Sequence, residues 1–293
     1  MKFRYLFLAF ITVIFWGISL PVTTVLLQNG FTPNLITFLR FLIATFLLYL
    51  VIRKRKMRSI AKEDRAHFYL LGLAGTTLFF FFENTALKFT TVSNTALITA
   101  TIPLFTLIVA AIFYQKKILW QNLIGIPLGL AGTVLLFYKD LQASSLHLKG
   151  DLLVVGSVTM WILYSFTYRK VEGKYDSLTI IYRTFIYGCL FSLPLLIFEF
   201  NRFRSININF SVLISLLFLA VFCTFLGYYF WTLAFKNIGV KVTSNLILLI
   251  PVVSIAAGVL FLKEIFTIPM LLASGFIICS VYLTSISHRG GYF

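Results

Sequence analysis

The sequence has little charge and few residues that bind metal or form disulfides. Asp, Glu, Lys and Arg make up 12% of the 293 residues, whereas 60% are hydrophobic. A soluble domain has about 25% charged residues, so this composition excludes a chain that meets water over most of its surface. The three cysteines, Cys189, Cys223 and Cys279, lie inside apolar runs without a CxxC spacing. The sequence therefore predicts neither a disulfide framework nor a cysteine metal site.

Motifs of catalysis and of energy coupling are also missing. The sequence contains no HExxH, GxSxG or Asp-rich metal motif, and its histidines, His67, His147 and His288, lie at segment ends. It contains no P-loop, so ATP hydrolysis by this chain is excluded as an energy source. The formal net charge of +16 comes from basic residues in short loops rather than on one amphipathic face, which argues against nucleic acid as a partner. We expect no cofactor and no metal.

Long apolar runs dominate what is present. A spanning helix needs about 20 mostly apolar residues. The first run, residues 5–27, is too long for the core of a signal peptide and is interpreted as a retained span. The fold predicted is an all-α polytopic membrane protein with ten transmembrane helices, at residues 4–27, 34–52, 67–87, 92–114, 118–138, 150–169, 177–199, 211–235, 241–262 and 266–286.

The basic residues predict the orientation in the bilayer. Lys and Arg are concentrated in cytoplasmic loops of membrane proteins. With the N-terminus inside, the basic stretch at residues 53–65, Lys116, Lys117, Arg169 and Lys170 all fall on the cytoplasmic side. We therefore expect both termini in the cytoplasm and a multi-pass protein of the cell (inner or plasma) membrane.

A repeated segment divides the chain. The segment at residues 82–106 recurs at residues 231–254 without a gap. Five helices in each copy make the second copy enter the membrane upside down. The predicted divisions are residues 1–138 and 150–287 as inverted repeats, 139–149 as an external linker and 288–293 as a cytoplasmic tail. In the alignment the identical pairs are Ala86/Ala234, Lys88/Lys236, Val92/Val240, Thr95/Thr243, Ile102/Ile250 and Pro103/Pro251.

Each copy of this segment reads as a helix end, a short break and a new helix with a proline inside it. Pro103 and Pro251 are predicted to kink those helices, because proline removes a backbone hydrogen bond. A duplicated pair of interrupted helices indicates a transporter's binding site near the midplane. The alternative is that the two halves are kept only for packing.

Two opposite charges lie at matching depth within neighbouring spans. Arg40 and Glu83 each lie about five or six residues from the outer end of a span, or roughly 8 Å deep at 1.5 Å per residue. We predict that they pair, as a structural salt bridge or as a charge pair that gates transport. In the second case Glu83 is a proton-sensitive group, which leaves proton coupling open, or a ligand for a substrate ammonium group.

Arg183 corresponds to Arg40 in the second copy but has no matching carboxylate, because Trp231 occupies the position of Glu83. Either its side chain reaches the cytoplasmic surface or it contacts a substrate carboxylate or phosphate.

Aromatic and hydroxyl side chains recur at helical spacing on several spans. Such a wall suits a partly apolar organic solute, and aromatic faces also hold cations. The alternatives are an interfacial aromatic belt and hydroxyls that bond to their own backbone. The candidate substrate-path residues are Trp16, Ser19, Glu83, Asn84, Asn94, Thr95, Thr99, Trp161, Tyr164, Ser165, Tyr168, Tyr228, Trp231, Ser244 and Asn245.

Gly125, Gly129 and Gly132 give one span a small-residue face that allows close packing within a chain or between chains. We expect a monomer or a weak homodimer.

Several short motifs, taken together, resemble the EamA-domain branch of the drug/metabolite transporter superfamily. They are FWGIS at residues 15–19, LRF around Arg40, ALKFTTV at 86–92 and IPLFT at 102–106. The resemblance covers nearly the whole chain as two copies. It implies ten helices as an inverted repeat, alternating access, and a cavity lined by helices one, three, four, six, eight and nine, often for export of amino acids or other metabolites.

The sequence departs from that family in two places. The acidic residue that often follows the fourth helix is replaced by Lys116 and Lys117, while the second copy keeps it as Glu264. Glu83 is not a general feature of the family.

The function predicted is a secondary-active or facilitated transporter that exports small organic metabolites, such as amino acids or related amphiphilic solutes, by alternating access. A non-transporting membrane receptor and an intramembrane lipid-modifying enzyme are the alternatives. The enzyme would need clustered carboxylates or a nucleophile with a base, and only Glu83 is predicted to lie deep enough.

Overall fold

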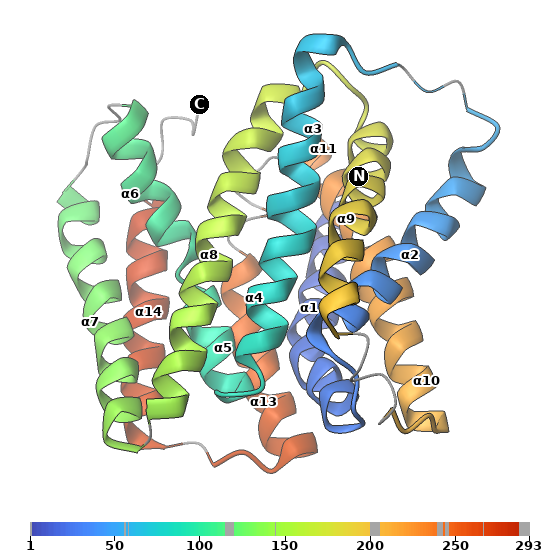
Figure 1. Ribbon diagram of the computed structural model, residues 1–293. Coiled ribbons are helices and arrows are strands. Elements are labelled where there is room, and N and C mark those ends of the chain that lie inside the picture. The colour runs from blue at the N-terminus through green and yellow to red at the C-terminus, as the bar shows by residue number, and fades with distance from the viewer. Residues whose placement is uncertain are drawn as a thin grey trace.

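The computed structural model describes residues 2–55, 57, 59–114, 120–143, 145–199, 206–238, 243, 246–265 and 267–286. Its regular elements are helices, most of which run lengthwise through the molecule, whereas α2 is inclined to the others (Figure 1). Their bounds in the first half are α1 Lys2–Gln28, α2 Pro33–Ile52, η1 Lys62–Asp64, α3 Arg65–Gly72, η2 Leu73–Leu78, α4 Phe79–Ala86, α5 Val92–Thr99, α6 Ile102–Tyr114 and α7 Trp120–Ala143.

The second half repeats this order. Its elements are α8 Ser145–Val171, α9 Ser177–Glu199, α10 Phe210–Leu217, η4 Phe218–Leu226, α11 Gly227–Ile238, η5 Leu246–Leu249, α13 Ile250–Leu262 and α14 Ile268–Ile286. The helices α7 and α8 extend into residues 139–149, the stretch expected to link the halves.

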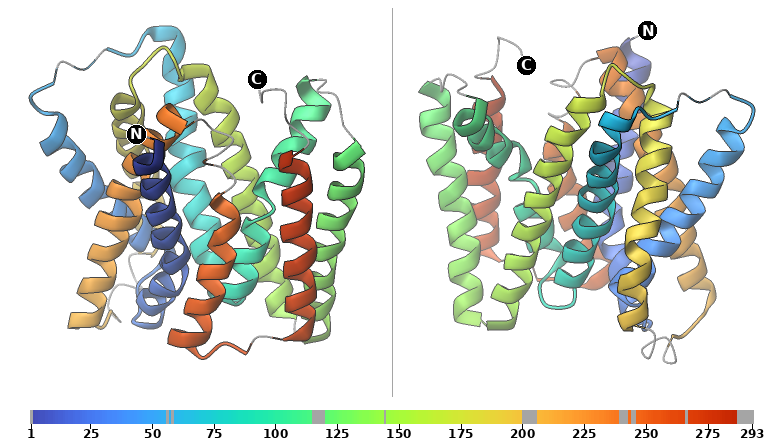
Figure 2. Two further views of the ribbon diagram at one scale, coloured as in Figure 1. Left: turned by 180° about the vertical axis from the view of Figure 1, so that it is seen from behind. Right: turned by 45° about the horizontal axis from the view of Figure 1, so that its top comes forward.

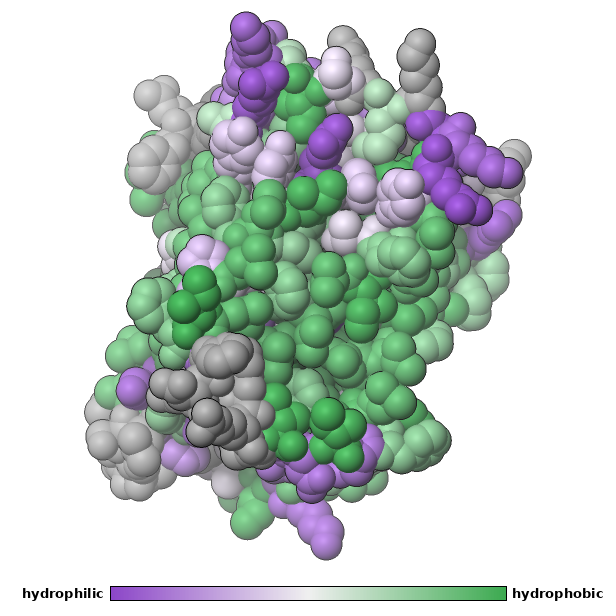
Figure 3. Space-filling model, turned by 45° about the vertical axis from the view of Figure 1, so that its right-hand side comes forward, coloured by the Kyte–Doolittle hydropathy of each residue, from purple (hydrophilic) through white to green (hydrophobic). Residues whose placement is uncertain are grey.

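Length and composition make this an all-helical membrane protein. Six helices of the described residues are long and apolar enough to cross a bilayer: Phe3–Gln28, Pro33–Ile52, Lys62–Ala86, His147–Val171, Ser177–Glu199 and Phe210–Ala234. Four shorter apolar helices, Val92–Thr106, Leu123–Gly132, Ile250–Leu262 and Ile268–Ser280, fall within the other four expected spans. On the face in Figure 3, a continuous hydrophobic belt separates two more hydrophilic ends.

The start of α1, the connection from α2 to α3 and the end of α14 lie at the same end of the molecule (Figures 1 and 2). This end therefore includes Arg53, Lys54 and Arg55, which are exposed.

The two halves are interleaved rather than side by side. Helix α1 packs on α11 and α13, α2 on α9, and α4 on α8, so each of these pairs joins the halves. The approach of α1 to α13 requires glycine, because a Cβ on Gly17 would lie 2.5 Å from Cβ of Val253. Beside it, the Ser254 hydroxyl donates a hydrogen bond to the Gly17 carbonyl at 2.8 Å.

The small-residue face of α7 packs within the chain. A Cβ on Gly132 would lie 3.0 Å from the Ala273 carbonyl oxygen of α14. On the same face, the Ser280 hydroxyl of α14 donates to the Gly125 carbonyl at 2.5 Å. Helix α14 therefore covers this glycine face of α7, and the two helices lie at the edge of the bundle in Figure 1.

The two prolines mark breaks between helices instead of kinks inside them, which corrects the prediction for Pro103 and Pro251. Helix α5 ends at Thr99 and α6 begins at Ile102, so Pro103 lies in the first turn of α6. Pro251 lies equally early in α13, after the 3-10 turn η5. Proline fits a first turn because its missing N–H has no acceptor there.

Each half contains a π-helical stretch at an equivalent position. The register that aligns Ala86 with Ala234 places Thr76 of η2 on Thr224 of η4. Each stretch packs on a helix of the other half, η2 on α9 and η4 on α2. Long π-helices are rare and often occur at functional sites.

Loops at both ends anchor these interrupted helices to the opposite half. At one end Lys174 and Tyr175 both donate to the buried Asp64 carboxylate, at 2.8 and 3.0 Å. The hydrogen bond from Lys174 to Asp64 raises the pKa of Lys174 above its usual value. At the other end the Asn207 N–H donates to the Asn29 carbonyl at 3.0 Å, and the Asn209 amide donates to the Asn29 side chain.

Candidate functional site

Aromatic rings from both halves meet around Trp16. The ring of Trp16 on α1 lies 6.5 Å from that of Trp161 on α8, centroid to centroid. It lies 6.0 Å from Tyr228 and 4.9 Å from Trp231, both on α11. Three other predicted path residues therefore pack on Trp16, and the interplanar angles of 47–80° are those of tilted and edge-to-face pairs.

The cluster continues along α8. The Trp161 ring lies 5.2 Å from Tyr164, and Tyr164 lies 6.0 Å from Tyr168. Phe79 of α4 packs on Trp161 at 5.1 Å. Sequence reasoning missed Phe79, because the chain has 33 phenylalanines and helical spacing distinguishes none of them.

A hydrogen bond to η4 fixes the orientation of Trp16. Its indole Nε1 donates to the Cys223 carbonyl at 2.9 Å. Gly227 makes room for the indole, because a Cβ there would lie 2.9 Å from Nε1. The π-helical stretch therefore positions the ring at the centre of the site.

Arg40 and Glu83 do not form the predicted ion pair, since within the described ranges no nitrogen of Arg40 lies within 4.0 Å of a Glu83 oxygen. Instead Arg40 Nε donates to the Thr224 hydroxyl at 2.9 Å, and the guanidinium carbon lies 4.2 Å from the Phe80 ring centroid. A neutral acceptor and an aromatic face thus hold this buried cation.

Glu83 is buried, with 7% of its surface exposed. It is close enough to Arg40 and Tyr228 to interact with them electrostatically. The described part of the chain offers its carboxylate no hydrogen-bond donor. The Tyr228 hydroxyl is likewise buried and has no partner there. A carboxylate and a phenol at the edge of the aromatic cluster are thus available to a ligand.

The other polar path residues mostly stabilise helices. Asn84 donates to Thr37 at 3.0 Å and joins α4 to α2. The Asn94 amide lies 3.4 Å from the Asp151 carboxylate and joins α5 to α8.

The hydroxyls of Ser19, Ser165 and Thr95 bond to carbonyls of their own helices. The Thr99 hydroxyl is buried, with no partner in the described ranges.

Two predicted path residues and one cation remain. Ser244 and Asn245 lie outside the described residues. Arg183 is half-buried, and its Nε has no hydrogen-bond partner among the described residues.

Two carboxylates beyond Glu83 are structurally important and were not expected to be. Asp151 is fully buried and accepts a hydrogen bond from Thr90 at 2.6 Å. Glu264 caps α5 of the other half: it accepts from the Val92 N–H at 2.6 Å and from the Ser93 N–H at 3.1 Å. The sequence signal for Glu264 was the family resemblance, in which it is the acidic residue kept by the second copy, but its hydrogen-bond partners follow only from the fold.

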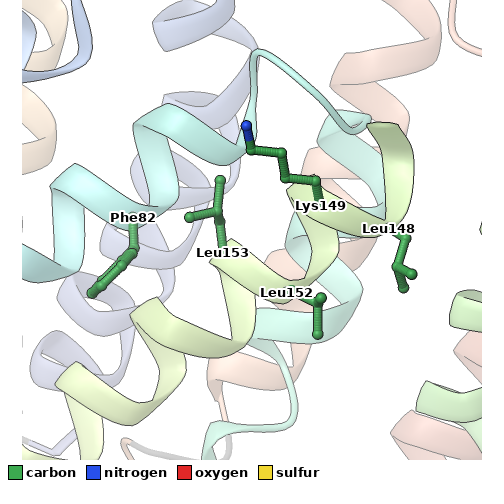
Figure 4. Close-up of a pocket in the computed structure, with 5 residues that line it drawn as sticks. All are labelled: Phe82, Leu148, Lys149, Leu152 and Leu153. Carbon is green, nitrogen blue, oxygen red and sulfur yellow. The ribbon is translucent and has the colours of Figure 1, made fainter. Parts of the chain in front are cut away.

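A shallow groove of about 350 Å³ lies apart from the aromatic cluster, between α4 and α8. Phe82, Leu148, Leu152 and Leu153 make its lining apolar. In Figure 4 the Lys149 ammonium points toward the connection after α4, where it lies 4.5 Å from the Phe89 ring.

The fold and the site together define a polytopic helical membrane protein of two similar halves with an aromatic centre shared between them. Comparison with known families agrees, since the EamA-like transporter family matches residues 3–138 and again residues 148–286. The chain therefore belongs to the EamA-like transporter family, within the drug/metabolite transporter superfamily. It is a transporter with a small-molecule substrate, and not an enzyme.

Individual relatives match over most of their length. An uncharacterized transporter of Archaeoglobus fulgidus is 28% identical over 274 residues, which is 93% of this chain and 95% of that protein. A protein of Salmonella typhimurium named "Probable amino-acid metabolite efflux pump" is 25% identical, with 97% of this chain and 95% of that one aligned.

One solved crystal structure aligns with a TM-score of 0.67 at 18% identity, over 99% of this chain and 100% of its own. That likeness supports the fold.

Proposed function

We propose that this protein exports small organic metabolites, such as amino acids or related amphiphilic solutes, as a secondary-active or facilitated transporter. The observation that carries the proposal is the meeting of Trp16, Trp161, Tyr228 and Trp231 beside the buried Glu83. The rings provide an apolar surface for a side chain, and the carboxylate provides a partner for an ammonium group.

Alternating access between two inverted repeats is the transport mechanism that we propose. Its support is the recurrence of interrupted helices, with breaks before Pro103 and Pro251 and π-helical stretches at Thr76 and Thr224. Transporters of this kind rock one repeat against the other around a central site. Because the aromatic cluster is built from both halves, such a motion would change access to it.

The export direction and the amino-acid class rest on relatives. Two aligned proteins, from Salmonella typhimurium and Escherichia coli, carry the name "Probable amino-acid metabolite efflux pump". Their identities of 25% and 24% make the substrate a proposal for this chain.

The test is transport by the purified protein in proteoliposomes. A thermal-shift screen against amino acids and related amines selects solutes that bind. We expect the selected solutes to leave preloaded vesicles faster with this protein than with Trp16→Ala, because the variant loses the central ring. If every solute that binds leaves vesicles with the protein no faster than it leaves protein-free vesicles, the proposed function is refuted.

A further inference from the structure

We propose that two equivalent arginine–threonine contacts act as alternating latches that set which side of the aromatic site is open. The outer latch consists of Arg40, Thr224 and Phe80, and it is formed in this structure. The inner latch consists of Arg183, Thr76 and Tyr228, and it is open. The inference rests on the proposed alternating-access function and assigns four positioning residues, Arg40, Thr224, Arg183 and Thr76, to it.

The outer latch joins the two halves at a π-helical stretch. Arg40 on α2 belongs to the first half, and Thr224 on η4 belongs to the second. Thr224 donates its hydroxyl hydrogen to the Leu219 carbonyl at 2.8 Å and accepts from Arg40 Nε at 2.9 Å. The Phe80 ring stacks with the guanidinium at 4.2 Å. The Arg40 side chain is 2% exposed, so this contact is sealed from solvent.

The repeat supplies the same three groups in the other half. Arg183 corresponds to Arg40, as both end similar segments, LITFLR and LTIIYR. The register of Ala86 with Ala234 pairs Thr76 with Thr224 and Phe80 with Tyr228. Helix α9, which carries Arg183, packs on η2, which carries Thr76. The inner latch therefore has its components on packed elements.

In this structure no hydrogen bond joins those components within the described residues. Thr76 donates to the Gly72 carbonyl of its own helix. A Cβ on Gly188 would clash with the Thr76 hydroxyl, so that hydroxyl lies against the α9 backbone. Arg183 Nε and the Tyr228 hydroxyl are both buried without a partner in the described part of the chain. Equivalent groups are thus satisfied in one half and unsatisfied in the other.

An unsatisfied buried polar atom is costly, so the unpaired Arg183 Nε favours the arrangement in which the inner latch is closed. The hydrogen bond between Arg40 and Thr224 favours the present arrangement. If the halves exchange arrangements, Arg183 gains the Thr76 hydroxyl and the Tyr228 ring while Arg40 releases Thr224. The energies of the two states then stay close, as a reversible transport cycle requires.

The test measures the distance between the halves. Spin labels are placed at Lys88 and Ile208, one on each half and both exposed, in the full chain with Cys189 and Cys279 replaced by serine. Cys223 is kept because its side chain is fully buried. Two label-to-label distances are expected, one for the present arrangement and a second for the arrangement with the inner latch closed. We expect Thr224→Val to raise the population of the second distance on the order of tenfold, since a hydrogen bond from a charged group is lost.

Matched variants separate a latch from a loss of stability. Thr224→Ser should keep the original distribution. Adding Thr76→Val to Thr224→Val should reverse the shift, because both latches are then lost. Thr159→Val serves as control, since its hydroxyl bonds only to its own helix, at Val155.

The latch proposal is overturned if Thr224→Val matches Thr159→Val, or if Thr76→Val pushes the distribution in the same direction as Thr224→Val. A wild-type protein that shows both distances but moves no solute would count against the proposed function and leave the latch standing.

Discussion

Single residues decide what the central site can bind. Trp16 contacts three other aromatic rings and is fixed by the Cys223 carbonyl, so its plane is set before a ligand arrives. Glu83 lies buried at the edge of these rings, with Arg40 as its electrostatic neighbour. Arg40 donates to Thr224 and forms no ion pair with this carboxylate among the described residues, as the proposed ammonium site requires.

At this scale we predict the effect of Glu83→Gln on transport. The half-saturating concentration of a substrate with an ammonium group should rise about tenfold, because a charge-assisted hydrogen bond becomes a neutral one. The measurement is the initial rate of flux in proteoliposomes over a range of concentrations. Glu172→Gln, at an exposed carboxylate, is the control. An unchanged half-saturating concentration would remove Glu83 from the binding site.

Helix ends and helix irregularities hold the halves together. The N-terminus of α5 has backbone N–H groups without partners in its own helix, and Glu264 of the other half satisfies two of them. Its charge also complements the positive end of the helix dipole. The π-helical stretches η2 and η4 also join the halves, because each lies in the middle of its helix and packs on a helix of the opposite half.

At this scale we predict that Glu264→Gln lowers thermal stability. The loss of charge at the α5 cap should cost about 1–2 kcal/mol and lower Tm by a few degrees. Unfolding of the purified protein in one detergent gives the measurement. Glu63→Gln, an exposed acidic residue at the start of η1, should leave Tm unchanged. Equal Tm values for both variants would show that the cap contributes little.

The whole molecule is organised by its relation to the bilayer. The start of α1 and the end of α14 lie at one end, together with the basic connection between α2 and α3 (Figure 2). A hydrophobic belt separates this end from the other (Figure 3). The excess of basic residues at one end predicts that this end faces the cytoplasm.

At this scale we predict the topology. Reporter tags at both termini should be accessible only after the cell membrane is permeabilised, whereas a cysteine placed at Lys88 should react in intact cells. Labelling with a membrane-impermeant reagent, with and without permeabilisation, measures this. Termini on opposite sides of the membrane would disprove the inverted repeat, because an even number of spans would then be wrong.

The membrane class, the ten apolar segments, the division into halves and the aromatic residues of the centre could be predicted from the sequence. The membrane class, the apolar segments and the aromatic positions follow from hydropathy and helical spacing, which are local properties. The division into halves follows from the repeated segment at residues 82–106 and 231–254. The match of the EamA-like transporter family to both halves confirms the membership that the short motifs indicated.

The partners of the buried polar groups could not be predicted from the sequence and are known from the fold. The pairing of Arg40 with Glu83 was predicted from their matching depth in the membrane. Depth does not fix the direction in which a side chain points around the helix axis, and Arg40 donates to Thr224 instead. The contacts of Glu264 and Asp151 join segments far apart in sequence. The π-helical stretches pack on helices of the opposite half, and a hydropathy pattern carries no information about which backbone carbonyl accepts from which donor.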